Sequence, residues 1–205
     1  MGRLFTYLFL GAFTSTATVE AQRINFSTFV QGENIVLTVI SNPSGVNFNA
    51  KQPLIVVGDP SVVQIDIMDN AVVVVELDAP IEYDLTAELS WETGLSRGGA
   101  DTGTTVPFEL RWAYNNTGEI SDIERRGNAV QVPPFFHTVT FPVYRRQAGG
   151  PPPPPPTPDH AGFVRQRGKA YLFIYGNLGP VPQGIAAGNY SADIQLNVTY
   201  ADNTF

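Results

Sequence analysis

Acidic side chains are the most numerous chemically active groups in this sequence, and several gather near two strand connections. Asp66 and Asp69 flank the first connection, and four more acids lie close to the next: Glu76, Asp78, Glu82 and Asp84. A glycosidase needs two carboxylates that face each other across a cleft, and spacing along the chain does not reveal such a pair. Calcium needs several oxygen ligands from one loop, and residues 66–69 offer too few. We therefore predict acids on exposed strand faces, with no catalytic carboxylate and no metal site.

Other groups that carry chemistry are scarce. The chain has two histidines, His137 and His160, and neither has a partner at metal-ligand spacing. No serine lies in a Gly-x-Ser-x-Gly elbow, and no glycine-rich loop with a lysine indicates phosphate binding. The absence of cysteine excludes disulfides, thiolate metal sites and thiol catalysis. We expect no enzyme activity and no cofactor.

Aromatic side chains could form a platform on which a sugar ring stacks. The candidates are Trp91, Trp112, Tyr114 and Tyr144. Packing in the core is the alternative. Between Tyr83 and Trp91 every second residue shares one face, and the alternation favours a place in the core for Trp91.

The overall charge narrows the range of partners. The chain has 12 basic and 19 acidic residues, which gives a formal net charge of −7 at pH 7. Nucleic-acid binding needs clustered Lys and Arg that displace counterions. Docking on anionic lipid also needs basic residues. We therefore expect neither nucleic acid nor an anionic membrane surface as a partner.

The first 21 residues are organised like a secretory signal peptide. Arg3 supplies the positive charge, residues 4–13 are an apolar stretch, and Val19-Glu20-Ala21 forms a cleavage site. A membrane anchor is the alternative, but about ten apolar residues cannot cross a bilayer core that takes roughly twenty. We predict cleavage after Ala21 and no membrane span. The mature chain would pass through the periplasm and be secreted, to lie outside the cell or on its outer surface.

The rest of the chain consists mainly of short apolar runs, which are typical of strands, separated by turns such as Asn42-Pro43-Ser44-Gly45. The run Val72–Val75 is apolar throughout, which favours a strand that is buried on both faces. About ten strands and no long helix predict an all-β protein, a two-layer antiparallel sandwich of the immunoglobulin-like or pilin-like kind. We assign residues 22–205 to one domain. The runs are 24–30, 35–40, 46–48, 54–57, 62–67, 72–77, 83–91, 108–112, 137–143, 171–175 and 188–200.

Two segments between these runs are predicted to be irregular. Gly94 to Gly103 has the composition of a polar loop. Residues 115–134 show no period, although Ser121-Asp122-Ile123-Glu124 has the spacing of a capping box. Gly127 would end such a helix within about two turns.

A proline-rich loop is predicted at residues 149–162. It contains the run Pro151–Pro156, which would project about 19 Å as a polyproline II helix. Prolines carry no N–H and cannot join a β-ladder. The run is therefore either a ligand for a proline-reading domain or a stiff loop between strands.

The last predicted strand shows the clearest alternation in the chain. Its apolar face is built from Tyr190, Ala192, Ile194, Leu196, Val198 and Tyr200. Its polar face is built from Ser191, Asp193, Gln195, Asn197 and Thr199. One face is predicted to be core, and the other faces solvent or a polar interface.

The segment Gly188–Tyr200 begins with the pattern Gly-x-Tyr. Together with the preceding segment Tyr171–Gly179, it resembles the last two strands of a known family of domains. That family comprises pilin-like domains of the spore coat protein U type and the chaperone–usher pilins. The resemblance implies a sandwich completed by a strand from a neighbouring subunit, through β-strand addition. Residues Ile24–Val30 are then either donated to a neighbour or close their own sheet, and the sequence leaves both readings open.

We therefore expect a structural or adhesive protein of a Gram-negative bacterium, pilin-like, that is secreted or held at the cell surface. It would assemble or dock by β-strand addition through its sheet edges. Its partners would be other protein subunits or envelope proteins, and it could form homo-oligomers in this way. The alternative is a monomeric extracellular binding module for carbohydrate or for an envelope protein.

Overall fold

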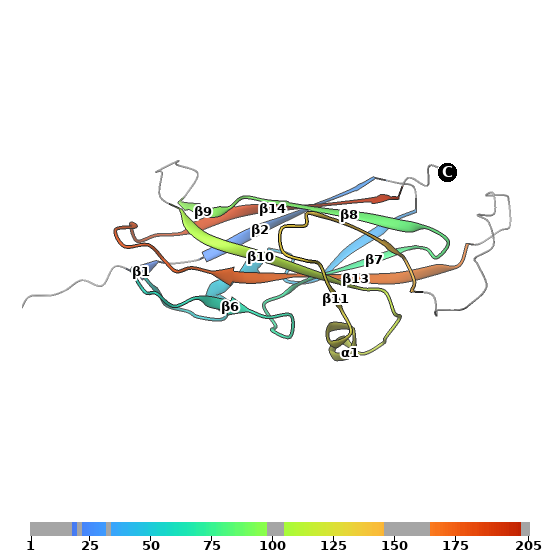
Figure 1. The fold of residues 1–205 in the computed structure, drawn as a ribbon, viewed down its shortest axis with the longest axis horizontal. Helices are drawn as coiled ribbons and strands as arrows, with labels where there is room; N and C mark the ends of the chain where they lie inside the picture. The colour runs from blue at the N-terminus through green and yellow to red at the C-terminus, as the bar shows by residue number, and fades with distance from the viewer. Residues whose placement is uncertain (1–17, 20–21, 32–33, 98–104, 146–164, 202–205) are drawn as a thin grey trace, which may run out of the picture.

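The chain is nearly all β (Figure 1), and the predicted all-β class is confirmed. The predicted proline-rich loop, His160 and most of the predicted signal peptide lie outside the described residues. Thr18–Val19, within the predicted signal peptide, pair with Ile55–Val56. The computed structural model describes residues 18–19, 22–31, 34–97, 105–145 and 165–201.

The described residues form fourteen strands, one α-helix and one 3-10 turn. Several strands are only two to four residues long, which is why the sequence predicts fewer of them. In chain order the elements are β1 (Thr18–Val19), β2 (Gln22–Gln31), β3 (Val36–Ser41), β4 (Val46–Asn47), η1 (Phe48–Ala50), β5 (Ile55–Val56), β6 (Val63–Ile65), β7 (Val73–Pro80), β8 (Asp84–Trp91), β9 (Gly94–Arg97), β10 (Val106–Asn115), α1 (Asp122–Gly127), β11 (Val130–Gln131), β12 (Thr138–Pro142), β13 (Arg167–Leu178) and β14 (Tyr190–Tyr200).

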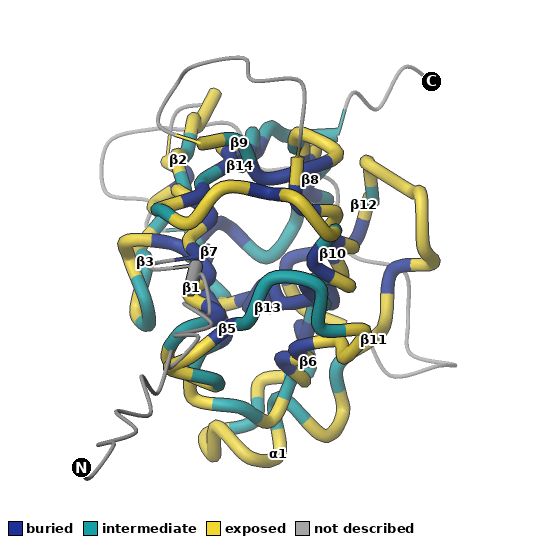
Figure 2. Tube along the Cα trace, turned by 90° about the vertical axis from the view of Figure 1, so that its left-hand side faces the viewer, coloured by how far each residue is buried: buried dark blue, intermediate teal, exposed yellow. Residues whose placement is uncertain are grey.

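Twelve strands belong to one sheet that curls round the hydrophobic core, with buried residues inside and exposed residues outside (Figure 2). The main path of the sheet is β12-β8-β14-β9-β10-β13-β7-β3. We call β12, β8, β14, β2 and β4 the β14 arm, and β10, β13, β7, β3, β6 and β11 the β13 arm. β9 pairs with β14 and with β10, so this four-residue strand joins the two arms. Gly94–Arg97 is therefore a strand, and the prediction of a polar loop from Gly94 to Gly103 is wrong for these four residues.

The alternation predicted for the last strand is confirmed in β14. Ile194, Leu196 and Val198 are fully buried, whereas Asp193 and Gln195 are exposed. One side of β14 pairs with β8 and β9 in antiparallel fashion, and the other side pairs with β2 in parallel. β14 is therefore an internal strand of its arm, and all ten residues of β2 pair with it.

Two strands of the β13 arm are buried on both faces. The four valines of Val72–Val75 are at most 1% exposed, as the apolar run predicted. In β13 the side chains of Leu172 and Ile174 alternate with those of Tyr171, Phe173 and Tyr175, and all five residues are buried. A buried outer face needs a cover, and the segment that contains α1 provides it.

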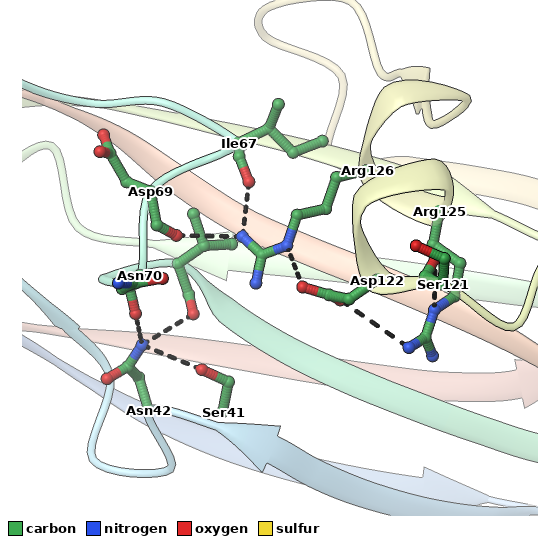
Figure 3. A network of polar contacts seen from close by, with 10 residues as sticks. Ser41, Asn42, Ile67, Asp69, Asn70, Ser121, Asp122, Arg125 and Arg126 are labelled. Carbon is green, nitrogen blue, oxygen red and sulfur yellow. Dashed lines mark hydrogen bonds and ion pairs between the residues drawn. The ribbon is translucent and has the colours of Figure 1, made fainter.

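The cover is held by arginines of α1 (Figure 3). The Arg125 guanidinium lies 4.2 Å from the centroid of the Tyr171 ring, and that of Arg126 lies 5.8 Å from the Phe173 ring. Arg126 Nη1 also donates to the carbonyl oxygens of Ile67 at 2.6 Å and Asp69 at 3.0 Å. The helix ends at Gly127 as predicted, but the side chain of Ser121 forms no capping hydrogen bond. Arginines rather than a cap therefore fix α1 on the sheet.

A substitution at Gly45 should detach β4 from β2. Gly45 has φ of 106°, and a Cβ built there would lie 1.7 Å from the carbonyl oxygen of Ile24. We expect Gly45→Ala to lower the free energy of unfolding by about 2 kcal/mol or more, because backbone strain and a steric clash act together. Denaturant unfolding measures the loss.

Gly184 is the matched control for this substitution. It has φ of 80°, but a Cβ there would meet no atom within 4 Å. Gly184→Ala should therefore cost only the strain of the left-handed conformation, about 1 kcal/mol. Equal losses in the two variants would contradict the role of the Gly45–Ile24 contact.

Among the helices that the structure describes, none is long and apolar enough to cross a membrane.

Candidate functional site

β2 and β3 are consecutive edge strands on the same side of the molecule (Figure 2). The side of β2 away from β14 pairs with β4 only at Arg23 and Ile24. β3 pairs with β7 alone. Within the described residues, 25–31 and 36–41 thus present backbone edges with no partner strand. We call these two stretches the open edge.

The open edge lacks the features that usually protect a sheet edge. Neither stretch contains a charged residue or a proline. Large apolar side chains are exposed on both strands: Phe29 (58%), Val30 (39%), Val36 (53%) and Ile40 (46%). Natural proteins discourage pairing with other chains by placing charges, prolines or bulges at such edges. A bulge between Val39 and Ser41 is the one such feature in these two strands.

The edge formed by β12 is less open to pairing. It is five residues long and ends at Pro142, whose ring removes one backbone donor. The contrast with β2 and β3 makes the open edge the better candidate for contact with another strand.

A second candidate surface is the outer face of β2, β14 and β8, where side chains of the three strands lie side by side. Two adjoining hollows of about 390 and 600 Å³ lie on this face. Asn25 Nδ2 donates to Asp193 Oδ1 at 3.0 Å across the β2–β14 pair. No Lys or Arg lines either hollow. The polar lining comprises Asn25, Ser27, Gln31, Glu88, Ser90, Glu92, Asp193, Gln195 and Asn197.

The four aromatic candidates do not form one platform. Trp112 is buried at 2% exposure, and Tyr114 stacks on Phe141 with ring centroids 4.6 Å apart. Tyr144 is 45% exposed beside α1, in a hollow of about 840 Å³. Trp91 packs against the core as predicted, but it is only half-buried.

Trp91 belongs to an aromatic cluster that the sequence analysis missed. Its ring stacks on His137, with centroids 4.1 Å apart, and it lines a hollow beside Phe135 and Phe136. These two phenylalanines are 89% and 60% exposed. The signal that could have found them is the sequence Pro133-Pro134-Phe135-Phe136, an apolar run without alternation.

The acidic candidates bind neighbouring side chains. Glu76 Oε1 lies 2.7 Å from Lys169 Nζ, and its Oε2 accepts a hydrogen bond from Tyr171 at 3.0 Å. Partial burial alone would raise the pKa of Glu76, but the bonds from Lys169 and Tyr171 outweigh it and hold that pKa below its ordinary value. The other pairs are Asp78–Arg167 at 2.6 Å, Glu82–Arg165 at 3.2 Å, Asp69–Lys51 at 2.6 Å and Asp66–Gln64 at 2.6 Å. Asp84 begins β8.

Metal ligands do not converge in the described part of the chain. The described ranges contain no group of three or more His, Asp or Glu side chains that could hold a metal ion. His137 is exposed and its Nδ1 lies 3.1 Å from the carbonyl oxygen of Leu89. His137 therefore contacts the sheet and Trp91, and no acid is among these contacts.

No protein-family model matches this chain, and a search of curated proteins found no match.

Proposed function

We propose that this chain is a secreted or cell-surface structural or adhesive protein, pilin-like, that joins copies of itself by β-strand addition. The open edge carries the proposal. Its seven residues in β2 (25–31) and six in β3 (36–41) contain no charge and no proline, and four large apolar side chains are exposed on them. Backbone groups of an edge supply affinity for an added strand, and alternate side chains supply specificity.

The architecture that we propose is a two-layer, immunoglobulin-like sandwich, with the β14 arm and the β13 arm as its layers. Phe26 of β2 and Leu37 and Val39 of β3 support it, since each is half-buried and packs against the core. On this view the open edge is the side at which the two layers part.

In the structure β2 pairs with β14 of its own chain at every residue from Gln22 to Gln31. The proposal therefore places the added strand outside β2 or β3 and leaves β2 in its own sheet. The secreted location rests on the predicted signal peptide.

Charges placed on the open edge should abolish assembly. We expect the native chain to form species larger than a monomer in sedimentation velocity, with mass increasing as concentration rises. Val30→Lys and Ile40→Lys test β2 and β3 separately, and both sites are exposed, so folding should be kept. At least one of these variants should stay monomeric, because an unpaired charge opposes an added strand.

Ile123→Lys is the matched control, since this residue is 74% exposed on α1 and far along the chain from both edge strands. It should assemble like the native chain. A native chain that is monomeric at every concentration, or edge variants that assemble normally, would exclude the proposal.

A monomeric extracellular module that binds carbohydrate is the second candidate. The observation in its favour is the outer face of β2, β14 and β8, where amide and carboxylate side chains border Phe29 and Trp91 in adjoining hollows. Sugars are held by such polar groups together with an aromatic ring. A monomer that is retarded in gels containing polysaccharide, and is released by Gln195→Ala, would favour this function.

A further inference from the structure

The loop between β11 and β12 displays two phenylalanines at a conformational cost. Phe135 has φ of 71° and is 89% exposed, and the neighbouring Phe136 is 60% exposed. A bulky residue in the left-handed region is rare and costs about 1–3 kcal/mol. Exposing two large apolar side chains to water adds to this cost. Strain of this kind persists only where surrounding contacts hold the loop.

Those contacts come from both arms of the sheet. From the β13 arm, Trp112 Nε1 donates to the carbonyl oxygen of Phe136 at 3.0 Å. From the β14 arm, the Leu89 N–H donates to the carbonyl oxygen of His137 at 2.7 Å, and Trp91 stacks on the His137 ring. Both arms thus hold the loop at the two residues that follow the strained Phe135.

The hollow beneath this loop, which we call the aromatic groove, has a volume of about 290 Å³. Its polar side chains apart from the Trp112 indole are Arg111 and Gln131, and no acid lines it. The indole N–H of Trp112 is already bonded to Phe136. The remaining lining is Trp91, Leu110, Val132, Pro133, Pro134, Phe135 and Phe136.

This lining suits a ligand with an apolar surface and acceptor groups. A sugar presents many hydroxyl donors, and the groove has no carboxylate to accept them. Polyproline presents ring carbons and backbone carbonyl oxygens and has no N–H to satisfy. Aromatic-lined grooves recognise its preformed helix. The Gln131 amide oxygen accepts from Tyr175, which leaves the amide N–H groups to donate to carbonyl oxygens of the ligand. Arg111 pairs with Glu109 at 3.1 Å through Nε and at 3.3 Å through Nη2, and its Nη1 can donate as well.

We propose that the aromatic groove binds the proline run Pro151–Pro156 of a second copy of this chain. The run lies outside the described residues. It begins six residues after Arg145, which limits its reach from there to about 21 Å at full extension. The groove adjoins His137, and β12 alone separates that residue from residues 143–145 by about 17 Å. Occupation by the chain's own run would use most of this reach and would need the linker to fold back along β12, so a second copy is the less constrained source.

This contact is independent of the open edge. Figure 2 shows β11 and β12 on the side of the molecule opposite β2 and β3. Variants of the groove and variants of the open edge can therefore fail separately.

Tryptophan fluorescence tests the proposal directly, because both tryptophans of the chain line the groove. A synthetic peptide of residues 149–160 should give a saturable change in emission, and the same peptide with Gly-Ser in place of the six prolines should give none. Phe136→Ala should weaken binding at least about tenfold, as truncation of a central aromatic contact does. Ile123→Ala, on α1 and 74% exposed, does not line the groove and should bind like the native chain.

A chain in which Gly-Ser replaces Pro151–Pro156 distinguishes the two sources of the run. It should bind the added peptide as the dilute native chain does, and it should self-associate more weakly in sedimentation velocity. No saturable change in emission, or equal binding by Phe136→Ala, would overturn the proposal. A third outcome is that only the Gly-Ser chain binds the peptide and that the native chain is monomeric. This outcome would show that the groove is occupied by the proline run of the same chain, and it would overturn the second copy as occupant.

Discussion

Deleting residues 22–31 should abolish the cooperative unfolding transition of this protein. β2 contributes the fully buried Ile24 and pairs with β14 over its whole length. Loss of one buried isoleucine side chain alone costs about 2–5 kcal/mol, against a total stability of about 5–15 kcal/mol for a domain. The deletion also exposes the edge of β14. Circular dichroism during heating should show no sharp transition.

Addition of a synthetic peptide of residues 22–31 should restore that transition, because the peptide can pair with β14. The control peptide carries Ile24→Asp and should have no effect, since a carboxylate at a fully buried position cannot be hydrated. A deletion variant that melts cooperatively near the native temperature would contradict the intramolecular role of β2. That result would instead favour donation of β2 to a neighbouring subunit.

Arg126→Ala should be the most damaging single change on α1. The Arg126 side chain is 9% exposed, and its guanidinium donates to two carbonyl oxygens and, at 2.7 Å, to Asp122. Hydrogen bonds that involve a charged group contribute about 1.5–3 kcal/mol each, and the carbonyl oxygens of Ile67 and Asp69 would lose their donor. We expect a loss of about 3 kcal/mol, which corresponds to roughly 6–12 °C in Tm for a domain of this size.

Two further variants isolate the cause. Arg125→Ala removes an ion pair of 3.9 Å and the contact with Tyr171, and it should cost only about 1 kcal/mol. Arg126→Lys keeps the charge but loses the planar fork, in which Nη1 reaches the two carbonyl oxygens while Nε reaches Asp122, and its cost should lie between those of the other two variants. If Arg125→Ala and Arg126→Ala lower Tm equally, the bonds to the carbonyl oxygens are not what fixes α1.

The sequence predicted the elements whose burial follows a local rule. Every second residue of β14 meets the core, so its period of two is visible in the chain. The valines of 72–75 are buried on both faces and form a continuous apolar run. The end of the short helix at Gly127 was also predicted, because glycine favours termination, but residues 115–134 were predicted to be irregular and in fact contain α1 and β11.

Features that depend on distant partners could not be predicted. β9 is four residues long and has the composition of a loop, and only its pairing with both β14 and β10 makes it a strand. The parallel pairing of β2 with β14 joins residues separated by 168 positions, which no local pattern encodes.

The candidate surfaces divide in the same way. The polar face of β14 is part of the alternation, so its exposure could be predicted from sequence. The open edge could not, because it arises from the absence of a neighbouring strand along 25–31 and 36–41 in the assembled sheet. The aromatic groove could not either, since Trp91, Trp112 and Phe136 come from three segments that meet only in the folded chain.

The pairing of β14 also sets the order in which the chain can fold. β14 lies between β2 and β8, so neither of these two strands can complete its ladder until residues 190–200 have been synthesised. Pairing between such distant segments carries a large loop-closure entropy and makes folding slow. The earlier strands β2 and β8 therefore keep unsatisfied backbone groups until β14 has been synthesised. The β14 arm can therefore complete its folding only after residues 190–200 have left the ribosome.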